Sequence, residues 1–395
     1  MNTTSLNIET LTPVHIGSGT DLNPNFEYLH FIDENVLTII DEEKVLDVIG
    51  EDNLSDWVSI IDKEEKLLPY LRKRRSGLSP NDVAERVIDL VEVAPGEKST
   101  LKEQLHAGKD KSAMIPGSSL KGSIRTAILR SLVLREPYFA GEENNISFKR
   151  GNRRIFKDGQ IQANYFGKKD RRNRNNELQL DANRDFMRMI RVTDAYFSSQ
   201  TECRKLEIVN EYRSGWGFKD RESSFVECIP KGVSSTTSIQ IPKQLLDLMN
   251  KKRFEKTETI LRNQKLFSLT EIFTTANKCT LAVIKEELSF WDEEGNPEPI
   301  GDYMETLEEF EKELEVLVKN EKPTACILRV GAGSGWDFMT GGWARKEDIM
   351  DDYIWNQLKT SVQKRDYRGN ASFPKTRKLI VGGIPLGFVK LSLKN

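Results

Sequence analysis

The feature that most constrains the fold of this chain is an irregular succession of short strand-like segments, separated by helical stretches and long polar insertions. The strand-like segments alternate apolar and polar residues or are short apolar runs bounded by turn residues. They are Leu6–Leu11, Met189–Ala195, Leu206–Val209, Ser238–Ile241, Cys326–Val330 and Leu386–Leu393. The pattern over residues 244–269 indicates a helix, whereas residues 281–290 are compatible with a helix or a strand. Strands interrupted in this way predict an α+β protein with long insertions.

Charge is strongly segregated along the chain, although the net charge of its 395 residues is only −2. Residues 149–191 hold thirteen Lys and Arg against five acids, whereas residues 286–321 hold fourteen acids against two Lys. Residues 33–65 are also acidic, with twelve acids and two Lys. One part of the surface can therefore attract phosphate, although solvated acidic helices would give the same pattern. The basic run over residues 168–174 is compatible with nonspecific attraction to RNA or with a plain solvated loop.

Several classes of protein are disfavoured by the sequence. No apolar run approaches the roughly 18 residues that a membrane-spanning helix needs, and the start MNTTSLNIET shows neither the basic leader nor the apolar core of a secretory signal. The four cysteines form no CxxC pair, so neither a zinc site nor a disulfide framework is expected. We therefore expect a cytoplasmic protein without membrane contact, metal or cofactor. Its length allows two domains.

The strongest local signal for ligand binding is a turn that leads into a helix. Pro116 and the glycine after it break the preceding structure, and two serines follow that can cap a helix or reach phosphate oxygens. The backbone N–H groups and partial positive charge of a helix start suit a phosphate. The candidate RNA-binding residues are Gly117, Ser118, Ser119, Lys121, Gly122 and Arg125, of which the two cations share one helical face. An ordinary capped surface helix is the alternative interpretation.

A second glycine-rich segment follows the strand-like run that ends at Val330. Its alternating glycines permit close passage of another backbone, and successive N–H groups can bind an anion. The candidate residues are Gly331, Gly333, Ser334, Gly335 and Trp336, followed by Thr340–Gly342. The tryptophan can stack on a base or fill a core, and a tight structural turn explains the glycines equally well. The spacing does not match a dinucleotide-binding loop.

His15 lies beside a short flexible segment formed by Gly17, Ser18 and Gly19. Imidazole is a common general base, so His15 is a candidate for metal-independent RNA cleavage. No partner carboxylate, tyrosine or second histidine lies nearby in the sequence, which favours a non-catalytic role. Asp194 has no metal-binding companion either, so we expect it to have a structural hydrogen-bonding role.

Read in order, these segments resemble the RAMP (repeat-associated mysterious protein) superfamily of CRISPR systems. The resemblance is carried by Leu11–Gly19, Ile115–Gly122 with Arg125, Arg191–Ala195, Glu227–Gly232, Leu328–Trp336 with Thr340, Pro374–Leu379 and Pro385–Val389. The glycine-rich and carboxyl-terminal segments are similar to one branch, the terminal backbone subunits of type III-A effectors (the fifth Csm subunits). The similarity is scattered over nearly the whole chain.

The resemblance implies two ferredoxin-like (RRM-like) domains, which we place at residues 1–245 and 246–395. It implies a non-catalytic subunit that binds the guide RNA (crRNA) near its 3′ end, supports its maturation and caps the backbone filament. The implied partners are the repeated RAMP backbone subunit, the small helical subunit, cellular ribonucleases for 3′ trimming and, indirectly, target RNA. Lys375 and Arg377 join the candidate RNA-binding residues. The alternatives are a metal-independent RAMP endoribonuclease with His15 as base, and the equivalent subunit of a type III-B complex.

Overall fold

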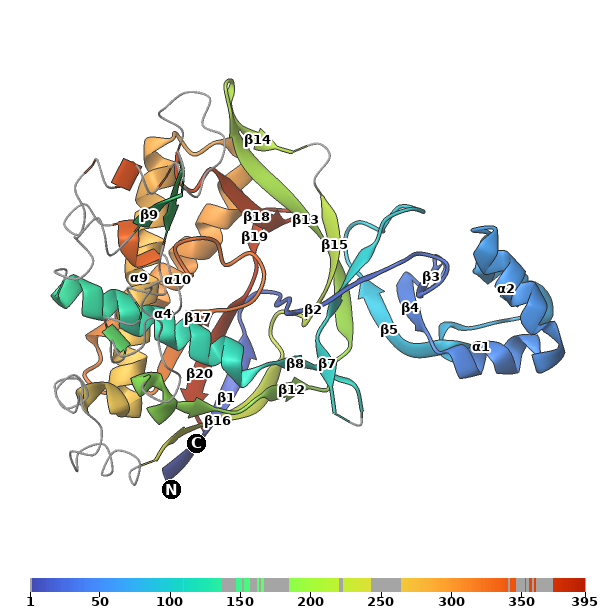
Figure 1. Cartoon of the computed structure of the whole chain (residues 1–395), viewed down its shortest axis with the longest axis horizontal. Helices are drawn as coiled ribbons and strands as arrows, with labels where there is room; N and C mark the ends of the chain where they lie inside the picture. The colour runs from blue at the N-terminus through green and yellow to red at the C-terminus, as the bar shows by residue number, and fades with distance from the viewer. Residues whose placement is uncertain are drawn as a thin grey trace.

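The computed structural model in Figure 1 shows a mixed α/β fold with an arm that extends to one side. The structure describes residues 2–108, 110–136, 147–150, 153–156, 162, 165–166, 185–219, 223–242, 264–339, 342–345, 352, 355–356, 359 and 372–394. None of the helices within these ranges has the length and apolar composition needed to cross a membrane. The basic run over residues 168–174, the predicted domain boundary and most of the helix predicted over residues 244–269 lie outside the described residues.

A five-stranded antiparallel sheet joins the two ends of the chain. Its strand order is β11-β16-β1-β20-β17, so the first and last strands lie side by side (Figure 1). The strands are β1 (Asn2–Thr10), β11 (Arg191–Val192), β16 (Ser234–Ile241), β17 (Ala325–Arg329) and β20 (Phe388–Leu393). In β1, the alternating Leu6 and Ile8 are fully buried, and Ile8 is paired with Leu391 of β20. The period of two in the sequence therefore marks one buried face of this sheet.

Three long helices cover this sheet, namely α4 (Gly117–Arg135), α9 (Leu269–Glu293) and α10 (Gly301–Lys319). Ile128 of α4 and Phe273 of α9 belong to one buried cluster, together with Leu328 of β17. Phe310 of α10 belongs to a second cluster, which also contains Phe388 of β20. Consecutive strand residues point to opposite faces, so the sheet is apolar on both sides where the helices cover it.

Helix α9 also protects the exposed edge of β17. The fully buried Asn277 donates from Nδ2 to the Ala325 carbonyl at 2.9 Å and accepts the Ile327 N–H at its Oδ1 at 3.1 Å. Thr280 donates to the Ile327 carbonyl at 2.9 Å. These side chains replace a missing neighbouring strand, because an unpaired strand edge needs hydrogen-bond partners.

A larger sheet continues from the centre into the arm. Its main path is β2-β6-β15-β13-β5-β4-β3, and β14, β18 and β19 attach beside β13. The strands are β2 (Gly17–Leu22), β3 (Tyr28–Phe31), β4 (Val36–Ile40), β5 (Ala84–Leu90), β6 (Leu101–Gln104), β13 (Thr201–Tyr212), β14 (Gly215–Phe218), β15 (Ser224–Cys228), β18 (Thr376–Ile380) and β19 (Ile384–Pro385). There are also two small sheets. One has three strands, β7 (His106–Ala107), β8 (Ser112–Ile115) and β12 (Ala195–Phe197), and the other has two, β9 (Ser147–Arg150) and β10 (Arg153–Phe156).

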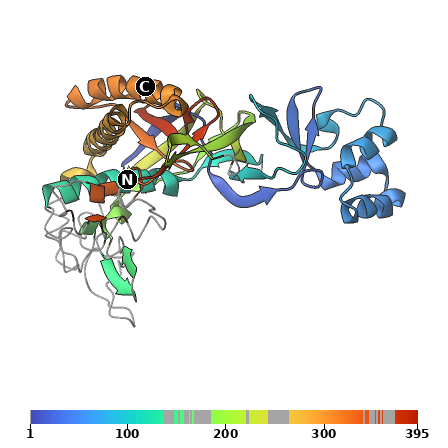
Figure 2. The ribbon, with the colours of Figure 1, turned by 90° about the horizontal axis from the view of Figure 1, so that it is seen from above.

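The arm consists of β3, β4 and the helices α1 (Glu42–Ile49), α2 (Leu54–Asp62) and α3 (Leu67–Arg74). It has its own buried cluster, which contains Phe31 from β3, Trp57 from α2 and Leu71 from α3. Figure 2 shows the arm projecting away from the helices that cover the central sheet.

The structure confirms most of the elements expected from the pattern. Strands cover most of the predicted segments, and the ambiguous residues 281–290 are helical within α9. The segment predicted as one strand at residues 189–195 differs, because β11 and β12 are separated by Thr193 and Asp194. The α+β prediction is therefore confirmed as a mixed α/β fold. The assignment of two ferredoxin-like domains stays a prediction.

Candidate nucleic-acid interface

Helix α4 begins at Gly117 in direct contact with the segment between β11 and β12. The Gly117 N–H donates to Asp194 Oδ1 at 2.7 Å, so a carboxylate 77 residues away caps the helix. A Cβ on Gly117 would lie 2.2 Å from the Val192 carbonyl oxygen, so only glycine fits. Of the two roles predicted for Ser118 and Ser119, capping of the helix is wrong, because both lie in its first turn. Contact of their hydroxyls with phosphate stays a prediction. The structural role expected for Asp194 is confirmed.

One face of α4 is lined by small residues. Ser119, Gly122, Ser123 and Thr126 are spaced so that they fall on one side of the helix. A Cβ placed on Gly122 would meet no atom of the protein within 4 Å. The protein itself therefore does not require glycine at this position, and the open space suits a close approach by another molecule. The sequence analysis selected Gly122 but missed Ser123 and Thr126, although their helical spacing was visible.

The two cations selected on α4 have different surroundings. Arg125 donates to Asp185 Oδ2 at 2.6 Å and to Gln162 Oε1 at 2.9 Å, and its guanidinium lies 4.0 Å from the centre of the Phe166 ring. These contacts favour a structural role for Arg125. Lys121 is half-buried and makes no hydrogen bond or ion pair with the described residues. Burial lowers the pKa of Lys121, and Asp185 opposes this effect.

The glycine-rich loop after β17 is tightly packed against the amino-terminal loop. Gly331 has φ +74°, and a Cβ there would lie 2.4 Å from the His15 carbonyl oxygen. The Ala332 N–H donates to that same carbonyl at 2.9 Å. Ser334 Oγ donates to the Gly331 carbonyl at 2.8 Å, and the Trp336 ring packs edge-on against Phe373 at 5.2 Å. Gly331 therefore satisfies a structural requirement.

The glycines further along the loop are less constrained. Gly333 has φ +79° and packs near Leu386, whereas a Cβ on Gly335 would approach no atom closer than 4.0 Å. Thr340 and Gly341 lie outside the described residues. The part of the loop around Gly335 is therefore open to a ligand, but its φ of +70° still favours glycine.

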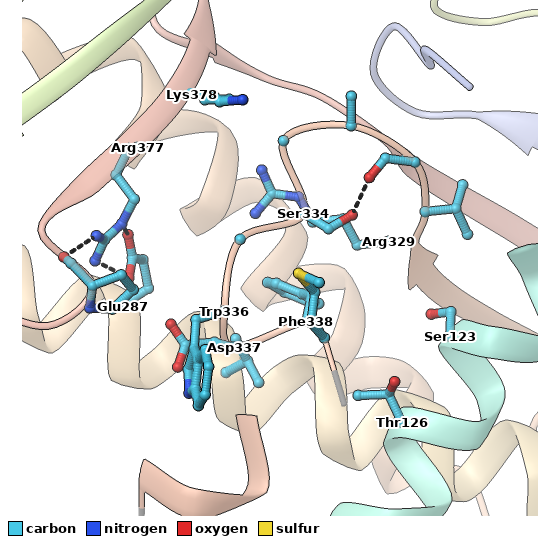
Figure 3. Close-up of a pocket in the computed structure, with 18 of the residues that line it drawn as sticks. Ser123, Thr126, Glu287, Arg329, Ser334, Trp336, Asp337, Phe338, Arg377 and Lys378 are labelled. Atoms are coloured by element: carbon cyan, nitrogen blue, oxygen red, sulfur yellow. Dashed lines mark hydrogen bonds and ion pairs between the residues drawn. The ribbon is translucent and has the colours of Figure 1, made fainter. Parts of the chain in front are cut away.

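A cavity of about 580 Å³ separates the small-residue face of α4 from the glycine-rich loop. Figure 3 shows Ser123 and Thr126 on one side of this cavity, with Arg377 and Glu287 on the other. Residues from α4, the loop and β18 line it, although α4 and β18 are more than 200 residues apart in the sequence. The volume lies within the range of about 300–1,000 Å³ common for ligand sites. We call this cavity and its rim the cleft.

The far wall of the cleft contains a buried ion pair. Arg377 donates from Nε to Glu287 Oε1 at 2.5 Å and from a terminal nitrogen to Oε2 at 2.8 Å. Glu287 also accepts hydrogen bonds from Trp291 Nε1 and the Tyr303 hydroxyl. Burial by itself would lower the pKa of Arg377, but the Glu287 carboxylate raises it. Because Arg377 is only 8% exposed, its surroundings favour a structural role over direct contact with RNA.

Two lysines lie near this wall. Lys375 directly precedes β18 and is half-buried, whereas Lys378 is exposed and lines the cleft. The sequence analysis selected Lys375 and missed Lys378. The alternation of β18 places Lys378 on the exposed side with Thr376, whereas the selected Arg377 lies on the buried side.

The amino-terminal loop contributes a buried histidine. His15 is 4% exposed, and its Nδ1 lies 2.6 Å from the Glu227 carbonyl oxygen. Since a carbonyl can only accept, Nδ1 carries the proton. Burial lowers the pKa of His15, so the ring is neutral near pH 7. This environment argues against His15 as a surface-accessible catalytic base.

The flexible segment after His15 lies at the start of β2. Gly17, Ser18 and Gly19 are all exposed, and Ser18 Oγ donates to Glu103 Oε2 at 2.8 Å. Their contact with RNA stays a prediction, and the neighbouring carboxylate is unfavourable for a phosphate at Ser18.

Glu227 begins the family-like segment Glu227–Gly232, but its role as a buried carboxylate, where β15 meets the base of the arm, was not predicted. Arg86 donates to both of its oxygens, at 3.1 and 3.0 Å, and Thr201 donates at 2.7 Å. His106 Nε2 lies 2.9 Å away. Burial alone would raise the pKa of Glu227, but His106 and Arg86 lower it to about 2. No local sequence signal identifies this site, because its partners are distant along the chain.

We expect the contribution of Glu227 to depend on pH. Its folded-state pKa is depressed, so its stabilisation is present above the ordinary pKa of 4.5 and is lost as pH falls toward about 2. A shift of this size corresponds to up to about 3 kcal/mol. Urea unfolding at several pH values should show that wild type has the higher free energy of unfolding at neutral pH. The difference in this free energy between wild type and Glu227→Gln should become smaller below pH 4.5. A difference that stays constant from pH 6 to pH 3 would contradict this assignment.

Among the described residues, no group of three or more His, Cys, Asp and Glu side chains is arranged to hold a metal ion. The four cysteines are free, and three of them are buried. The cleft is lined by hydroxyls, backbone groups, the cations Arg329, Arg377 and Lys378, and the carboxylates of Glu287 and Asp337.

Comparison with known proteins gives one matching family. A family model for the RAMP superfamily matches residues 7–336. A protein of Methanocaldococcus jannaschii described as "CRISPR system Cms protein Csm5" is 23% identical over 347 residues, covering 85% of this chain and 72% of the relative.

Two solved structures share the fold over nearly the whole chain. One is a chain of a Csm–crRNA–target RNA ternary complex of a type III-A CRISPR-Cas system, with TM-score 0.73 and 21% identity over 98% of this chain and 100% of that one. The other is Csm5 of T. onnurineus, with TM-score 0.65 and 19% identity over 97% and 99% of the two chains. The residues of the cleft therefore belong to a fold that occurs in an RNA-containing assembly.

Proposed function

Since this chain belongs to the RAMP superfamily, we propose that it is a non-catalytic subunit of a type III-A (Csm) CRISPR effector and binds the guide RNA in its cleft. The curated relative is described as Csm5, and one structure of similar fold comes from a complex with crRNA and target RNA.

The observation that carries the proposal is the convergence of three separate segments on one cleft. Ser119 and Gly122 of α4, the glycine-rich loop and Arg377 of β18 were predicted from the sequence to bind RNA, and all three segments line one cavity. Small side chains and glycines allow a sugar-phosphate backbone to approach closely, and hydroxyls can donate to phosphate oxygens. Such contacts position RNA without reading its sequence.

One exposed cation supports the same path for RNA. Lys378 lines the cleft, and none of the charged residues described in α10 does. Lys121 does not line the cleft, because at 100° per residue it lies on the opposite side of α4 from the small residues. Each phosphate neutralised by a lysine releases counterions, so binding should weaken as salt rises. We infer that the RNA backbone passes over the open side of α4, near Gly122.

Gly122→Leu is expected to weaken binding of a labelled single-stranded RNA at least about tenfold, which corresponds to about 1.4 kcal/mol. The new side chain meets no protein atom at its Cβ, so it occupies the space assigned to RNA. Stability should not fall, since leucine favours a helix by up to about 1 kcal/mol over glycine. The measurement is a fluorescence anisotropy titration with thermal unfolding in parallel.

Gly301→Leu provides the matched control, because Gly301 opens α10 and also has no atom within 4 Å of an added Cβ. It should bind RNA like wild type. Equal affinities of the Gly122→Leu and Gly301→Leu variants would remove the face of α4 from the proposed interface.

Lys121→Met should reduce the salt dependence of RNA binding. Loss of one phosphate contact lowers the slope of log affinity against log salt by about 0.7 for a single strand. Methionine retains much of the half-buried apolar stem of Lys121. Lys312→Met, on the exposed surface of α10, makes the same change in net charge and should leave the slope unaltered. An unchanged slope for Lys121→Met would show that this cation does not contact phosphate.

We further propose the finer features of the type III-A role for this chain. These are two ferredoxin-like domains, capping of the backbone filament at the crRNA 3′ end, and contacts with the repeated RAMP subunit and the small helical subunit. Support of crRNA maturation through cellular ribonucleases, and a place in the cytoplasm, belong to the same proposal. The buried, neutral His15 supports the non-catalytic role.

A further inference from the structure

Helix α2 carries more apolar surface than the core of the arm uses. Its inward residues, Trp57 and Ile60, are buried in the arm cluster. Leu54, Val58 and Ile61 continue the same apolar arc around the helix but are 47%, 48% and 41% exposed. At 100° per residue these three side chains fall on one stripe. We call them the α2 stripe.

The α2 stripe has the pattern by which a helix recognises a partner. Its positions are i, i+4 and i+7, the spacing of anchor residues in helix-mediated contacts. Single exposed apolar residues are common, but neighbouring ones on one helix face mark an interaction surface. Figures 1 and 2 show α2 at the outer end of the arm, far from α4, so the stripe is separate from the cleft.

Acidic side chains surround the α2 stripe. Glu51 and Asp52 precede α2, Asp62 ends it, and Glu64 and Glu65 follow, all of them exposed. Among the described residues, the nearby Lys63 and Lys73 form no ion pair, whereas Lys66 pairs with Glu97. The arginines on α3 and directly after it are paired.

These pairs are Arg72 with Asp33, Arg74 with Asp56 and Arg75 with Asp82. An apolar stripe with an acidic border is complementary to an apolar stripe with a basic border. The same acidic border repels nucleic acid.

We propose that the α2 stripe is a docking surface for a basic amphipathic helix of a partner protein. The partner's apolar side chains would cover Leu54, Val58 and Ile61, and its Lys or Arg side chains would face the acids at both ends of α2. This contact is independent of RNA binding and would connect the end of the arm to another protein.

The test uses two designed 18-residue helical peptides as probes. Both carry leucines along one face, but one has lysines beside that face and the other has glutamates in their place. Each labelled peptide is titrated with the full chain at low and high salt. We expect the basic peptide to bind at least ten times more tightly than the acidic one, and to weaken as salt rises.

The variant Leu54→Ser/Val58→Ser/Ile61→Ser should weaken binding of the basic peptide at least tenfold. The triple variant has the same net charge as wild type. Val58→Ser alone should cause a smaller loss of affinity for the basic peptide, so the proposal can still be tested if the triple variant does not fold. Val316→Ser is the control, because Val316 is 68% exposed on the acidic helix α10 and is distant from the stripe. It should not alter binding.

Three outcomes would overturn the proposal. The first is equal binding of the basic and acidic peptides. The second is that the folded triple variant binds the basic peptide as tightly as wild type does. The peptide would then be held only by nonspecific attraction to acidic surfaces. The third is self-association of the chain in sedimentation velocity that the triple variant abolishes, since a second copy would then occupy the stripe. A loss of RNA binding in Gly122→Leu has no bearing on any of these results.

Discussion

Substitution of Arg377 by methionine is expected to lower the free energy of unfolding by about 3–5 kcal/mol, because it leaves a buried carboxylate without its counter-charge. The Arg377 and Glu287 side chains are only 9% and 6% exposed, and two parallel hydrogen bonds join them. The guanidinium also donates to the Pro374 carbonyl at 2.6 Å and lies 5.3 Å from the centre of the Trp291 ring. Urea unfolding monitored by circular dichroism measures the loss.

A double-mutant cycle separates a structural role of Arg377 from a contact with RNA. Adding Glu287→Leu to Arg377→Met removes the uncompensated charge, so it should recover a large part of the lost stability. If the pair is structural, the double variant should also recover RNA affinity. A destabilisation below about 1 kcal/mol for Arg377→Met, or a double variant that is stable but does not bind RNA, would contradict the structural assignment.

Gly117→Ala is expected to lower the free energy of unfolding by about 3 kcal/mol and to abolish RNA binding, because the start of α4 is displaced. The three atoms nearest to the new Cβ are backbone atoms of Val192 and Thr193, at 2.2, 2.7 and 2.8 Å. No side-chain rotation relieves such contacts, so the first turn of α4 must move away from Asp194. The better helix propensity of alanine offsets at most about 1 kcal/mol.

Gly122→Ala is the control for the destabilisation expected of Gly117→Ala. It makes the same change five residues along the helix, where an added Cβ has no neighbour within 4 Å, and it should raise stability by about 0.5–1 kcal/mol. Equal unfolding free energies for the Gly117→Ala and Gly122→Ala variants would show that the start of α4 is not held against the β11–β12 segment.

The strands were predictable because burial on one face leaves a period of two in the sequence. Leu6 and Ile8 show it in β1. The doubly covered β17 was predictable for another reason, since a strand buried on both faces is a continuous apolar run. The choice between helix and strand at residues 281–290 was not predictable, since α9 packs against both β17 and α10 and is apolar on more than one side.

The positions of the site segments were predictable, but the roles of individual side chains were not. Arg125 and Arg377 resemble RNA-binding cations in the sequence, yet each meets a carboxylate, Asp185 or Glu287, that lies 60 or 90 residues away. The cap on α4 similarly comes from Asp194, and nothing around Ser118 indicates it. Local patterns identify where backbone can approach a ligand, whereas long-range pairing decides which charges remain available.

We propose that RNA lies in the cleft between α4 and the glycine-rich loop. Photo-crosslinking of bound RNA containing 4-thiouridine, followed by identification of the modified peptides by mass spectrometry, tests this placement. We expect crosslinks within residues 119–126 and 331–339 and their loss in Gly122→Leu. Crosslinks confined to the arm or to the outer surface of α10 at saturating RNA would contradict it.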